Sequence, residues 1–184
     1  MRSVHAFARA IDRLNEGIGV SVAWLALLMV LLEFAVVMMR YVFGLGSVKM
    51  QESIVYMHAI VFMVAAGYTL LHNGHVRCDV FYAAASPHRK AVIDLIGVFV
   101  FLLPMCAVIV WVAWPYVAAA WAVREGSPEG SLGIPGVYLL KSVILVFAGL
   151  LALQGLALAA RSALRLAGVD EPATAAADER EPGL

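Results

Sequence analysis

The sequence predicts an all-α integral membrane protein with four transmembrane helices, an N-terminal amphipathic surface helix and both termini in the cytoplasm. Hydrophobic residues make up 63% of the 184 residues and charged residues only 14%. The mean hydropathy is +0.89. The surface of a water-soluble domain of this size needs far more charge. The formal net charge is zero, which gives no argument for a nucleic-acid partner.

The first element, residues 1–17, has the pattern of a helix that lies on a membrane surface. Its apolar residues recur at helical spacing, and three arginines are displaced from them. The apolar set is Val4, Phe7, Ala8, Ile11 and Leu14, and the arginines are Arg2, Arg9 and Arg13. The run that follows, 18–39, lacks a small-residue cleavage site and is longer than a signal-peptide core, so it predicts an uncleaved first span.

The second span is expected at residues 53–71. A helix over this stretch covers about 28 Å at a rise of ~1.5 Å per residue, close to the ~30 Å hydrocarbon thickness. Asn73-Gly74 after it predicts a turn, and Ser86-Pro87 predicts the start of the next helix.

The third and fourth spans are expected at 92–114 and 137–160. Pro104 should kink the third, which membrane helices tolerate when neighbours satisfy the freed carbonyl. Small residues on one face of the fourth suit close helix packing, either within the chain or against a partner; they are Ala148, Ala152, Gly155 and Ala159. The remainder, 161–184, is expected to be a cytoplasmic, largely disordered tail.

Lysine and arginine in the short loops predict the orientation. With the N-terminus inside, eight cationic residues are cytoplasmic and three lie outside, which agrees with the positive-inside rule. The inner set is Arg2, Arg9, Arg13, Arg77, Arg89, Lys90, Arg161 and Arg165, and the outer set is Arg40, Lys49 and Arg124.

Three ionisable residues fall inside the expected spans at similar depth: Glu33, His58 and Lys141. Such groups are costly in a membrane, so they predict a polar cluster in which Glu33 pairs with Lys141 or His58. The alternative is that His58 and Lys141 extend outward to the membrane surface.

Motifs of catalysis or cofactor binding are scarce. A zinc site can be drawn from His72, His75, Cys78 and Asp79, but no second ligand cluster supports it, and no metal is predicted. Only His58 lies within a span, which disfavours bis-histidine haem ligation. Cys78 and Cys106 suggest no disulfide. We expect no enzyme and no cofactor in this chain. Without internal repeats, the sequence favours a small subunit whose partner holds a translocation path.

Several motifs around the four spans resemble the small permease subunit of tripartite ATP-independent periplasmic (TRAP) transporters, over nearly all of residues 18–160. They are Arg40-Tyr41-Val42-Phe43-Gly44, Glu52, Gly67 and His75-Val76-Arg77-Cys78-Asp79. Three further stretches resemble the branch for mannitol, chloroaromatic or 2-oxo acid uptake; they are residues 116–121, Glu125-Gly126-Ser127 and residues 133–141. One departure is Lys49-Met50-Gln51-Glu52, where the family often has Trp-x-Glu-Glu.

The resemblance implies a supporting role in a bacterial inner membrane. In such systems a periplasmic solute-binding protein delivers an organic acid, and a large permease subunit moves it with a sodium gradient. Sodium is expected in that large subunit, which the small subunit braces. The alternative from another class is a membrane anchor for a redox enzyme.

Two groups of residues receive roles on this basis. A charged periplasmic rim could dock the receptor; its members are Arg40, Lys49, Gln51, Glu52, Arg124, Glu125 and Glu129. On the cytoplasmic side, His75, Arg77 and Asp79 match the family's motif after the second span, where a structural role is expected.

Overall fold

The computed structural model describes residues 2–75, 82 and 85–169. In this part of the chain every regular element is helical, and four helices are long and apolar enough to cross a membrane. They are Val4–Val42, Val48–Leu71, Pro87–Ala122 and Val137–Leu166. The predicted fold class is therefore confirmed, while the orientation stays a prediction.

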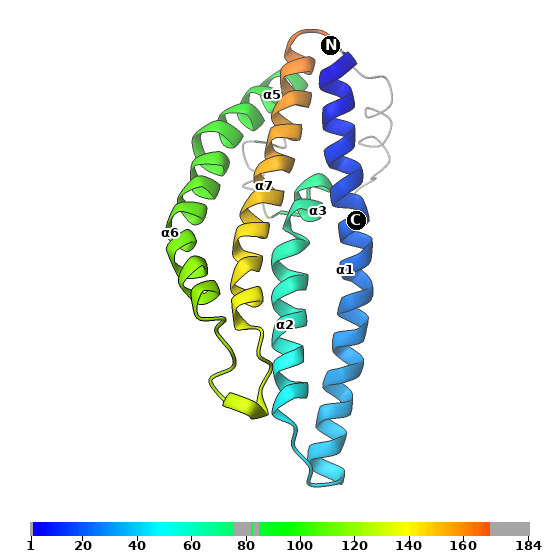
Figure 1. Cartoon of the computed structure of the whole chain (residues 1–184). Helices are drawn as coiled ribbons and strands as arrows, with labels where there is room; N and C mark the ends of the chain where they lie inside the picture. The colour runs from blue at the N-terminus through cyan, green and yellow to red at the C-terminus, as the bar shows by residue number, and fades with distance from the viewer. Residues whose placement is uncertain (1, 76–81, 83–84, 170–184) are drawn as a thin grey trace.

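Helix α7 (Val137–Leu166) is the centre of the bundle (Figure 1). It contacts α1 (Arg2–Val42), α2 (Val48–Val64), α3 (Ala66–Leu71), α5 (Pro87–Ile96) and α6 (Leu103–Ala122). Helices α1, α2 and α7 run nearly parallel, and α6 bows outward beside α7. Side chains from α3, α6 and α7 form the main apolar core, with Ala66, Cys106, Ala148 and Leu151 buried together.

The first helix has no break at Gly17, where the sequence analysis ends the expected surface helix. Helix α1 is continuous from Arg2 to Val42. Ala8 and Ile11 from its first part are buried against Ala157 of α7, so protein and not lipid covers them. The structure thus does not separate residues 1–17 from the first span, and a surface location for them stays a prediction.

The second span begins earlier than expected because Ser47 caps it. The Ser47 hydroxyl accepts a bond from the Met50 amide, and α2 starts at Val48. The helix is interrupted at Ala65, and α3 continues it to Leu71. Asn73 follows with φ 54°, which fits the predicted turn at Asn73-Gly74.

The third span bends at a π-helical segment, η1 (Gly97–Leu102), which lies just before Pro104. Ser86 caps α5, with Pro87 in its first turn. The proline ring at position 104 excludes a regular bond to the carbonyl one turn earlier, and widening the preceding turn is a usual solution. The expected kink is therefore seen in the curve from α5 through α6 (Figure 1). Helix α6 continues through Pro115 to Ala122, beyond the expected end at 114.

The small residues of the fourth span pack inside this chain. Ala148 is buried in the core, and Ala152 packs against it. A Cβ at Gly155 would lie 2.6 Å from Leu102 Cδ2, and Ala159 is also buried. The internal alternative for this face is therefore the one the structure favours. Residues 161–166 extend α7 and do not begin the tail.

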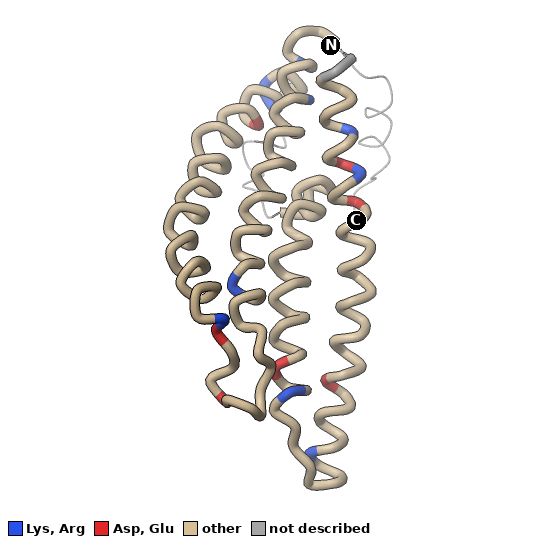
Figure 2. Tube along the Cα trace, viewed as in Figure 1, with Lys and Arg blue, Asp and Glu red and all other residues tan. Residues whose placement is uncertain are grey.

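Charged residues gather in two layers near the two ends of the bundle (Figure 2). We name them after one member each: the Asp12 layer holds Asp12, Glu16, His72 and Arg161, and the Lys141 layer holds Glu52, Glu125 and Lys141. Between them, residues 17–32 of α1 and 142–160 of α7 include no Asp, Glu, Lys or Arg. Twenty residues separate Lys141 from Arg161, about 30 Å along a helix, which matches the hydrocarbon thickness.

Close packing of α1 against α3 predicts a sharp effect at one glycine. A Cβ at Gly19 would lie 2.1 Å from the ring of Tyr68, whereas a Cβ at Gly17 would meet nothing within 4 Å. Overpacking costs about 1–3 kcal/mol. We expect Gly19→Ala to lower the melting temperature in detergent by roughly 3 °C or more. Gly17→Ala is the control, and equal melting temperatures for the two variants would contradict this packing.

Candidate functional site

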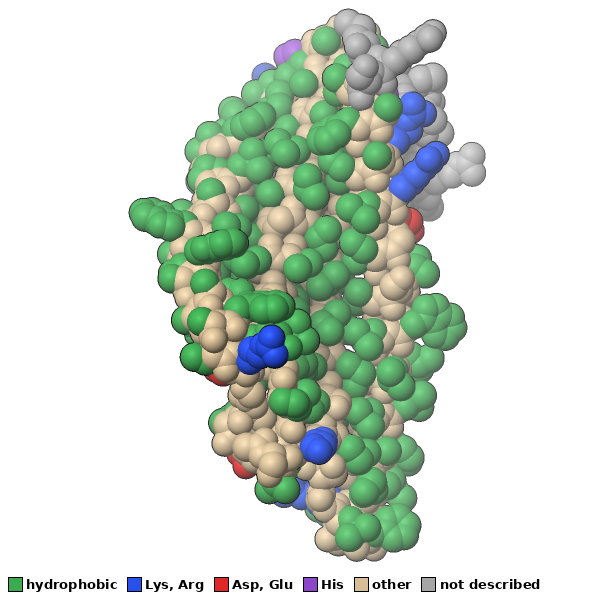
Figure 3. Space-filling model, in the orientation of Figure 1, with side chains coloured by type: hydrophobic (Ala, Val, Ile, Leu, Met, Phe, Trp, Pro, Cys, Tyr) green, Lys and Arg blue, Asp and Glu red, His purple; other side chains and the backbone are tan. Residues whose placement is uncertain are grey.

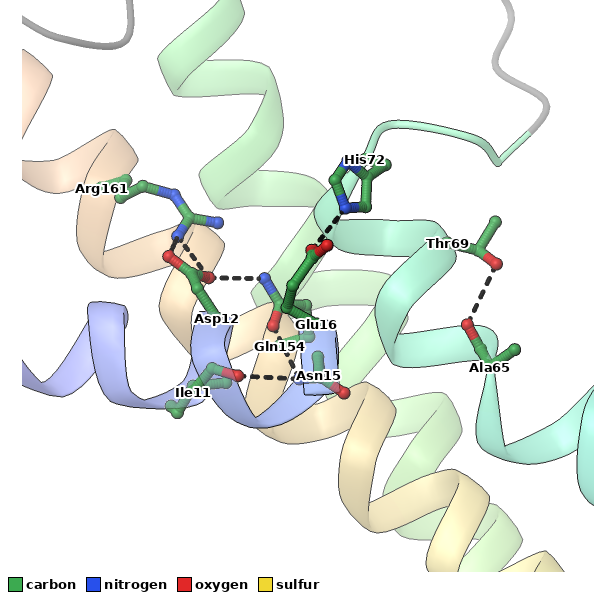
Figure 4. A network of polar contacts seen from close by, with 9 residues as sticks. All are labelled: Ile11, Asp12, Asn15, Glu16, Ala65, Thr69, His72, Gln154 and Arg161. Atoms are coloured by element: carbon green, nitrogen blue, oxygen red, sulfur yellow. Dashed lines mark hydrogen bonds and ion pairs between the residues drawn. The ribbon is translucent and has the colours of Figure 1, made fainter. Parts of the chain in front are cut away.

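The strongest polar feature of the described chain is a line of side chains between α1 and α7 (Figure 4). Arg161 Nη1 donates to both carboxylate oxygens of Asp12, at 2.8 and 2.6 Å. Gln154 Nε2 donates to Asp12 Oδ1 at 3.0 Å, and Asn15 Nδ2 donates to Gln154 Oε1 at 2.8 Å. The line thus runs from a charged pair into an amide pair.

The two amides are completely enclosed. Asn15 and Gln154 are each 0% exposed. Burying an amide is unfavourable unless it is hydrogen-bonded. A shift of α1 along α7 would break these hydrogen bonds and leave both amides buried without partners, so it is disfavoured. The amide pair therefore fixes the register of the two helices.

Helix α3 packs against this line of side chains at Asn15. Asn15 Oδ1 has no hydrogen-bond partner among the described residues, and a Cβ at Gly67 would lie 2.2 Å from it. Only glycine leaves room for this approach, which gives a physical reason for Gly67. In the residue after Asn15, Glu16 Oε2 lies 2.7 Å from His72 Nε2, and the His72 ring packs on Tyr68. The Asp12 layer thus joins α1, α3 and α7.

At the other end of the bundle, Glu52 holds the connection between α6 and α7. Its Oε1 accepts a short bond from the Ser127 hydroxyl, and its Oε2 accepts from the Ile134 amide at 2.6 Å. Gly133 is buried between them, and a Cβ there would collide with both Ser127 and Glu52. The carboxylate therefore ties the start of α2 to residues 127–134.

Lys141 forms a second tie at the same level. Its Nζ lies 2.6 Å from Glu125 Oε2 and 3.9 Å from the centre of the Tyr116 ring. The side chain of Lys141 is only 14% exposed. Next to it, Trp121 Nε1 donates to Ser142 Oγ at 2.8 Å, and the Trp121 ring meets Tyr138 edge to face. These contacts join the end of α6 to the start of α7.

The described residues do not join the three members of the expected intramembrane cluster to one another. No hydrogen bond or ion pair within the described residues joins Glu33, His58 and Lys141. Lys141 pairs with Glu125 because the loop before α7 folds back over its first turns, a contact that linear depth along the spans does not reveal. Glu33 is exposed on α1, and the His58 ring stacks with Phe62.

The expected charged rim divides into two groups. Glu52 and Glu125 are held by partners within the chain. The other five are exposed: Arg40, Lys49, Gln51, Arg124 and Glu129. Three cations and one anion therefore remain on this surface, so its free charge is mostly positive.

The cytoplasmic motif is described only in part. His75 is exposed, while Arg77 and Asp79 lie outside the described residues. Cys78 and Asp79 of the drawn zinc site lie outside as well, and His72 is paired with Glu16. No group of three metal-ligating side chains is present among the residues that are described.

Sequence reasoning missed the line formed by Asp12, Asn15, Gln154 and Arg161. The sequence pattern identifies Arg161 only as a loop charge that indicates the orientation, and it gives the other three residues no role. A signal was present, since Asn15 and Gln154 interrupt apolar faces of their helices. Their pairing joins residues 139 positions apart, which spacing alone does not predict.

The geometry defines a class of protein: a membrane-spanning helix bundle whose polar side chains join its own helices at both ends. The chain belongs to the family described as tripartite ATP-independent periplasmic transporters, DctQ component, which it matches over residues 29–165. Comparisons with curated proteins and with solved structures found no match. Asp12, Asn15 and Glu16 precede the matched residues, so their roles rest on geometry.

Family membership settles the class of function. The DctQ component is the small permease subunit of a TRAP transporter, which is a transporter component and not an enzyme family. Within such systems it works with a large permease subunit and a periplasmic binding protein. Together with the four apolar helices, this makes the chain a multi-pass membrane protein.

The ion pair of the Asp12 layer gives a test by double mutation. Asp12→Asn leaves the Arg161 guanidinium without a carboxylate at a site where the two side chains are only 27% and 23% exposed. We expect a loss of about 1–3 kcal/mol in the free energy of unfolding. The double variant Asp12→Asn, Arg161→Gln should lose less than the sum of the single variants. Denaturant unfolding in mild detergent gives the free energy of unfolding of the unsubstituted protein, the two single variants and the double variant.

Exposed Arg165 on the same helix provides the control for this cycle. Arg165→Gln should change stability by less than about 0.5 kcal/mol. Strict additivity of Asp12→Asn and Arg161→Gln would contradict a coupled pair.

The hydrogen bonds of Glu52 predict that residues 127–134 become less rigid when its carboxylate is replaced. In Glu52→Gln one oxygen acceptor is replaced by an amino group that cannot accept from Ser127 or Ile134. If the lost hydrogen bonds stabilise the loop by ~1 kcal/mol, the fraction of molecules in which the loop is open rises about fivefold. We therefore expect faster amide hydrogen exchange in residues 127–134. Glu129→Gln makes the same chemical change at an exposed side chain and should leave exchange unaltered.

Proposed function

We propose that this chain braces the large permease subunit of a TRAP transporter during sodium-driven uptake of an organic acid. The acid is delivered by a periplasmic receptor, and the complex lies in a bacterial inner membrane with both termini of this chain inside. Membership of the DctQ family supports this role. The large subunit supplies the sodium sites and the translocation path.

The observation that carries the proposal is the internal use of the polar groups. Asp12, Arg161 and Gln154 join α1 to α7, and Glu52 joins α2 to the loop before α7. A brace must hold its helices in a fixed arrangement while a neighbour moves, and ties at both ends of the bundle supply that stiffness. A translocation path needs polar groups directed into an open cavity instead.

The branch and the substrate class are finer parts of the proposal. Residues 133–141 carry the resemblance to the branch for mannitol, chloroaromatic or 2-oxo acid uptake. Gly133 and Lys141 of that stretch have tight contacts, with Glu52 and Glu125 respectively. These contacts give the motif a structural reason, while substrate choice is assigned to the other subunits.

Receptor docking is assigned to the free part of the rim. Arg40, Lys49 and Arg124 are exposed and form no ion pair within the described residues, whereas Glu129 is the single free acid among the expected rim residues. A surface with this balance attracts an acidic face of the receptor, and such charges act mainly on the rate of association. Glu52 and Glu125 contribute by holding the loop that presents Arg124.

The alternative of a redox-enzyme anchor is not favoured by the family match. A haem anchor would require histidines on facing helices, and His58 stacks with Phe62 of its own helix. Purified protein without a Soret band would agree with the transporter role, and a coloured protein would favour the anchor.

Co-purification tests the role directly. The full chain, tagged at its C-terminus, is expressed with the proteins encoded beside it, and we expect a large multi-span protein at equal stoichiometry. The reconstituted pair with the receptor should take up an organic acid only with an inward sodium gradient. Recovery of the chain alone, or of a redox partner, would contradict the proposed function.

A further inference from the structure

The side of α1 that turns away from the bundle carries a continuous apolar stripe. Seven side chains recur at alternating steps of four and three residues, which places them along one face of the helix. We call them the α1 stripe: Val20, Trp24, Leu27, Leu31, Phe34, Met38 and Tyr41. Their exposed fractions range from 38% for Met38 to 81% for Tyr41. Figure 3 shows how apolar the surface of the bundle is in one view.

Lipid tails can cover the part of the stripe that lies in the hydrocarbon, so that part alone does not indicate a partner. The depth of the hydrocarbon is therefore decisive. The Asp12 layer and the Lys141 layer are about 30 Å apart along α7, which equals its thickness. Sliding the chain by two helical turns in either direction would immerse one charged layer, at a high cost.

Helix α1 continues well past the Lys141 layer. The same distance of about 30 Å, measured along α1 from Asp12, corresponds to twenty residues and ends at Leu32, which is next to Glu33. Met38 and Tyr41 lie five and eight residues beyond Glu33, about 8 and 12 Å further along the helix. The headgroup region adds only ~5–8 Å on each side of the hydrocarbon. Tyr41 therefore lies beyond the reach of lipid.

The connection after α1 extends this uncovered region. Val42, Phe43 and Leu45 are 60%, 67% and 58% exposed. In Figure 1 the turn between α1 and α2 reaches further than the connection between α6 and α7. A contiguous apolar surface in water marks a site that another protein covers. No residue of the described chain covers it.

We propose that the α1 stripe, with its extension to Leu45, binds a second integral membrane protein whose apolar helical face also continues beyond the bilayer. This inference rests on the proposed function, under which that protein is the large permease subunit. A soluble receptor could reach only the end of the stripe, whereas a membrane partner can follow it from the hydrocarbon outward. Arg40, which adjoins Tyr41 at the edge of the receptor-docking rim, is exposed and has no ion pair in the described chain, so it can also meet a carboxylate of this membrane partner.

The test substitutes residues that lie outside the hydrocarbon, where a polar side chain does not impede membrane insertion. Met38→Ser with Tyr41→Ser removes the end of the stripe. Val123→Ser with Leu132→Ser is the matched control, since these residues are 73% and 65% exposed near the same end of the bundle but on other elements. Each pair is introduced into the full tagged chain and co-expressed with the neighbouring large membrane protein.

We expect the Met38, Tyr41 variant to recover at least about tenfold less large subunit, identified by mass spectrometry, at an unchanged level of its own chain. The Val123, Leu132 variant should recover it as the unsubstituted chain does. A photo-crosslinking phenylalanine analogue at Phe34 or Tyr41 should attach to the large subunit, and the same analogue at exposed Phe101 of η1 should not.

The outcomes separate this inference from the proposed function. If the unsubstituted chain recovers no large membrane protein, the proposed function fails and the inference with it. If it does, but the Met38, Tyr41 variant recovers as much, the stripe is not the interface. Crosslinks from Tyr41 only to lipid or only to the receptor would also overturn the inference.

Discussion

The enclosed amide pair of Asn15 and Gln154 is the contact on which the arrangement of the bundle depends. Apolar helix faces can pack in many registers, because lipid tails are as apolar as the side chains and no hydrophobic driving force selects one register. Two buried amides 2.8 Å apart allow only one register. The charge pair of Asp12 and Arg161 reinforces it at one end, where Gln154 shares the Asp12 carboxylate. With α1 fixed on α7, Gly67 can bring α3 against Asn15.

The second end of the bundle is fixed by a different kind of contact. Glu52 accepts bonds from a side chain and from the backbone of the connection between α6 and α7, and Lys141 pairs with Glu125 at its start. A loop without regular structure is thereby attached to α2 and to the first turns of α7. Helix contacts in the membrane and loop contacts outside it thus act on the same helix, α7. The bundle has few ways to deform without breaking a polar contact at one end.

The fold could be predicted from the sequence because it follows from apolar length and turn residues, which are local properties. Ser86-Pro87, Asn73-Gly74 and Pro104 marked a helix start, a turn and a bend that the structure contains. The boundaries at Gly17 and at residue 160 were less predictable. Helix α1 and helix α7 each continue past the expected membrane edge because they pack on one another there, as Ile11 does on Ala157.

The polar contacts could not be predicted because they depend on tertiary packing. Depth along the spans placed Glu33, His58 and Lys141 at one level, but depth says nothing about which face each side chain occupies. Lys141 had a partner much closer in sequence, Glu125, which a folded loop brings to 2.6 Å. For the same reason, the sequence predicts Glu52 to be a charge of the docking rim and does not predict its contacts with the loop. A carboxylate near a span end can be a docking charge or a loop tie, and only its neighbours in space distinguish the two.

Helix α1 is longer than these two fixed ends require. A helix held at Asp12 needs about twenty further residues to reach the Lys141 layer, yet α1 has thirty before it ends at Val42. Within a lone bundle the extra turns would only expose Tyr41, Val42 and Phe43 to water, which is unfavourable. Their apolar character is consistent with selection for contact with another chain. Under the proposed function, a rigid helix that extends past the membrane edge gives the small subunit a larger contact surface for the large subunit.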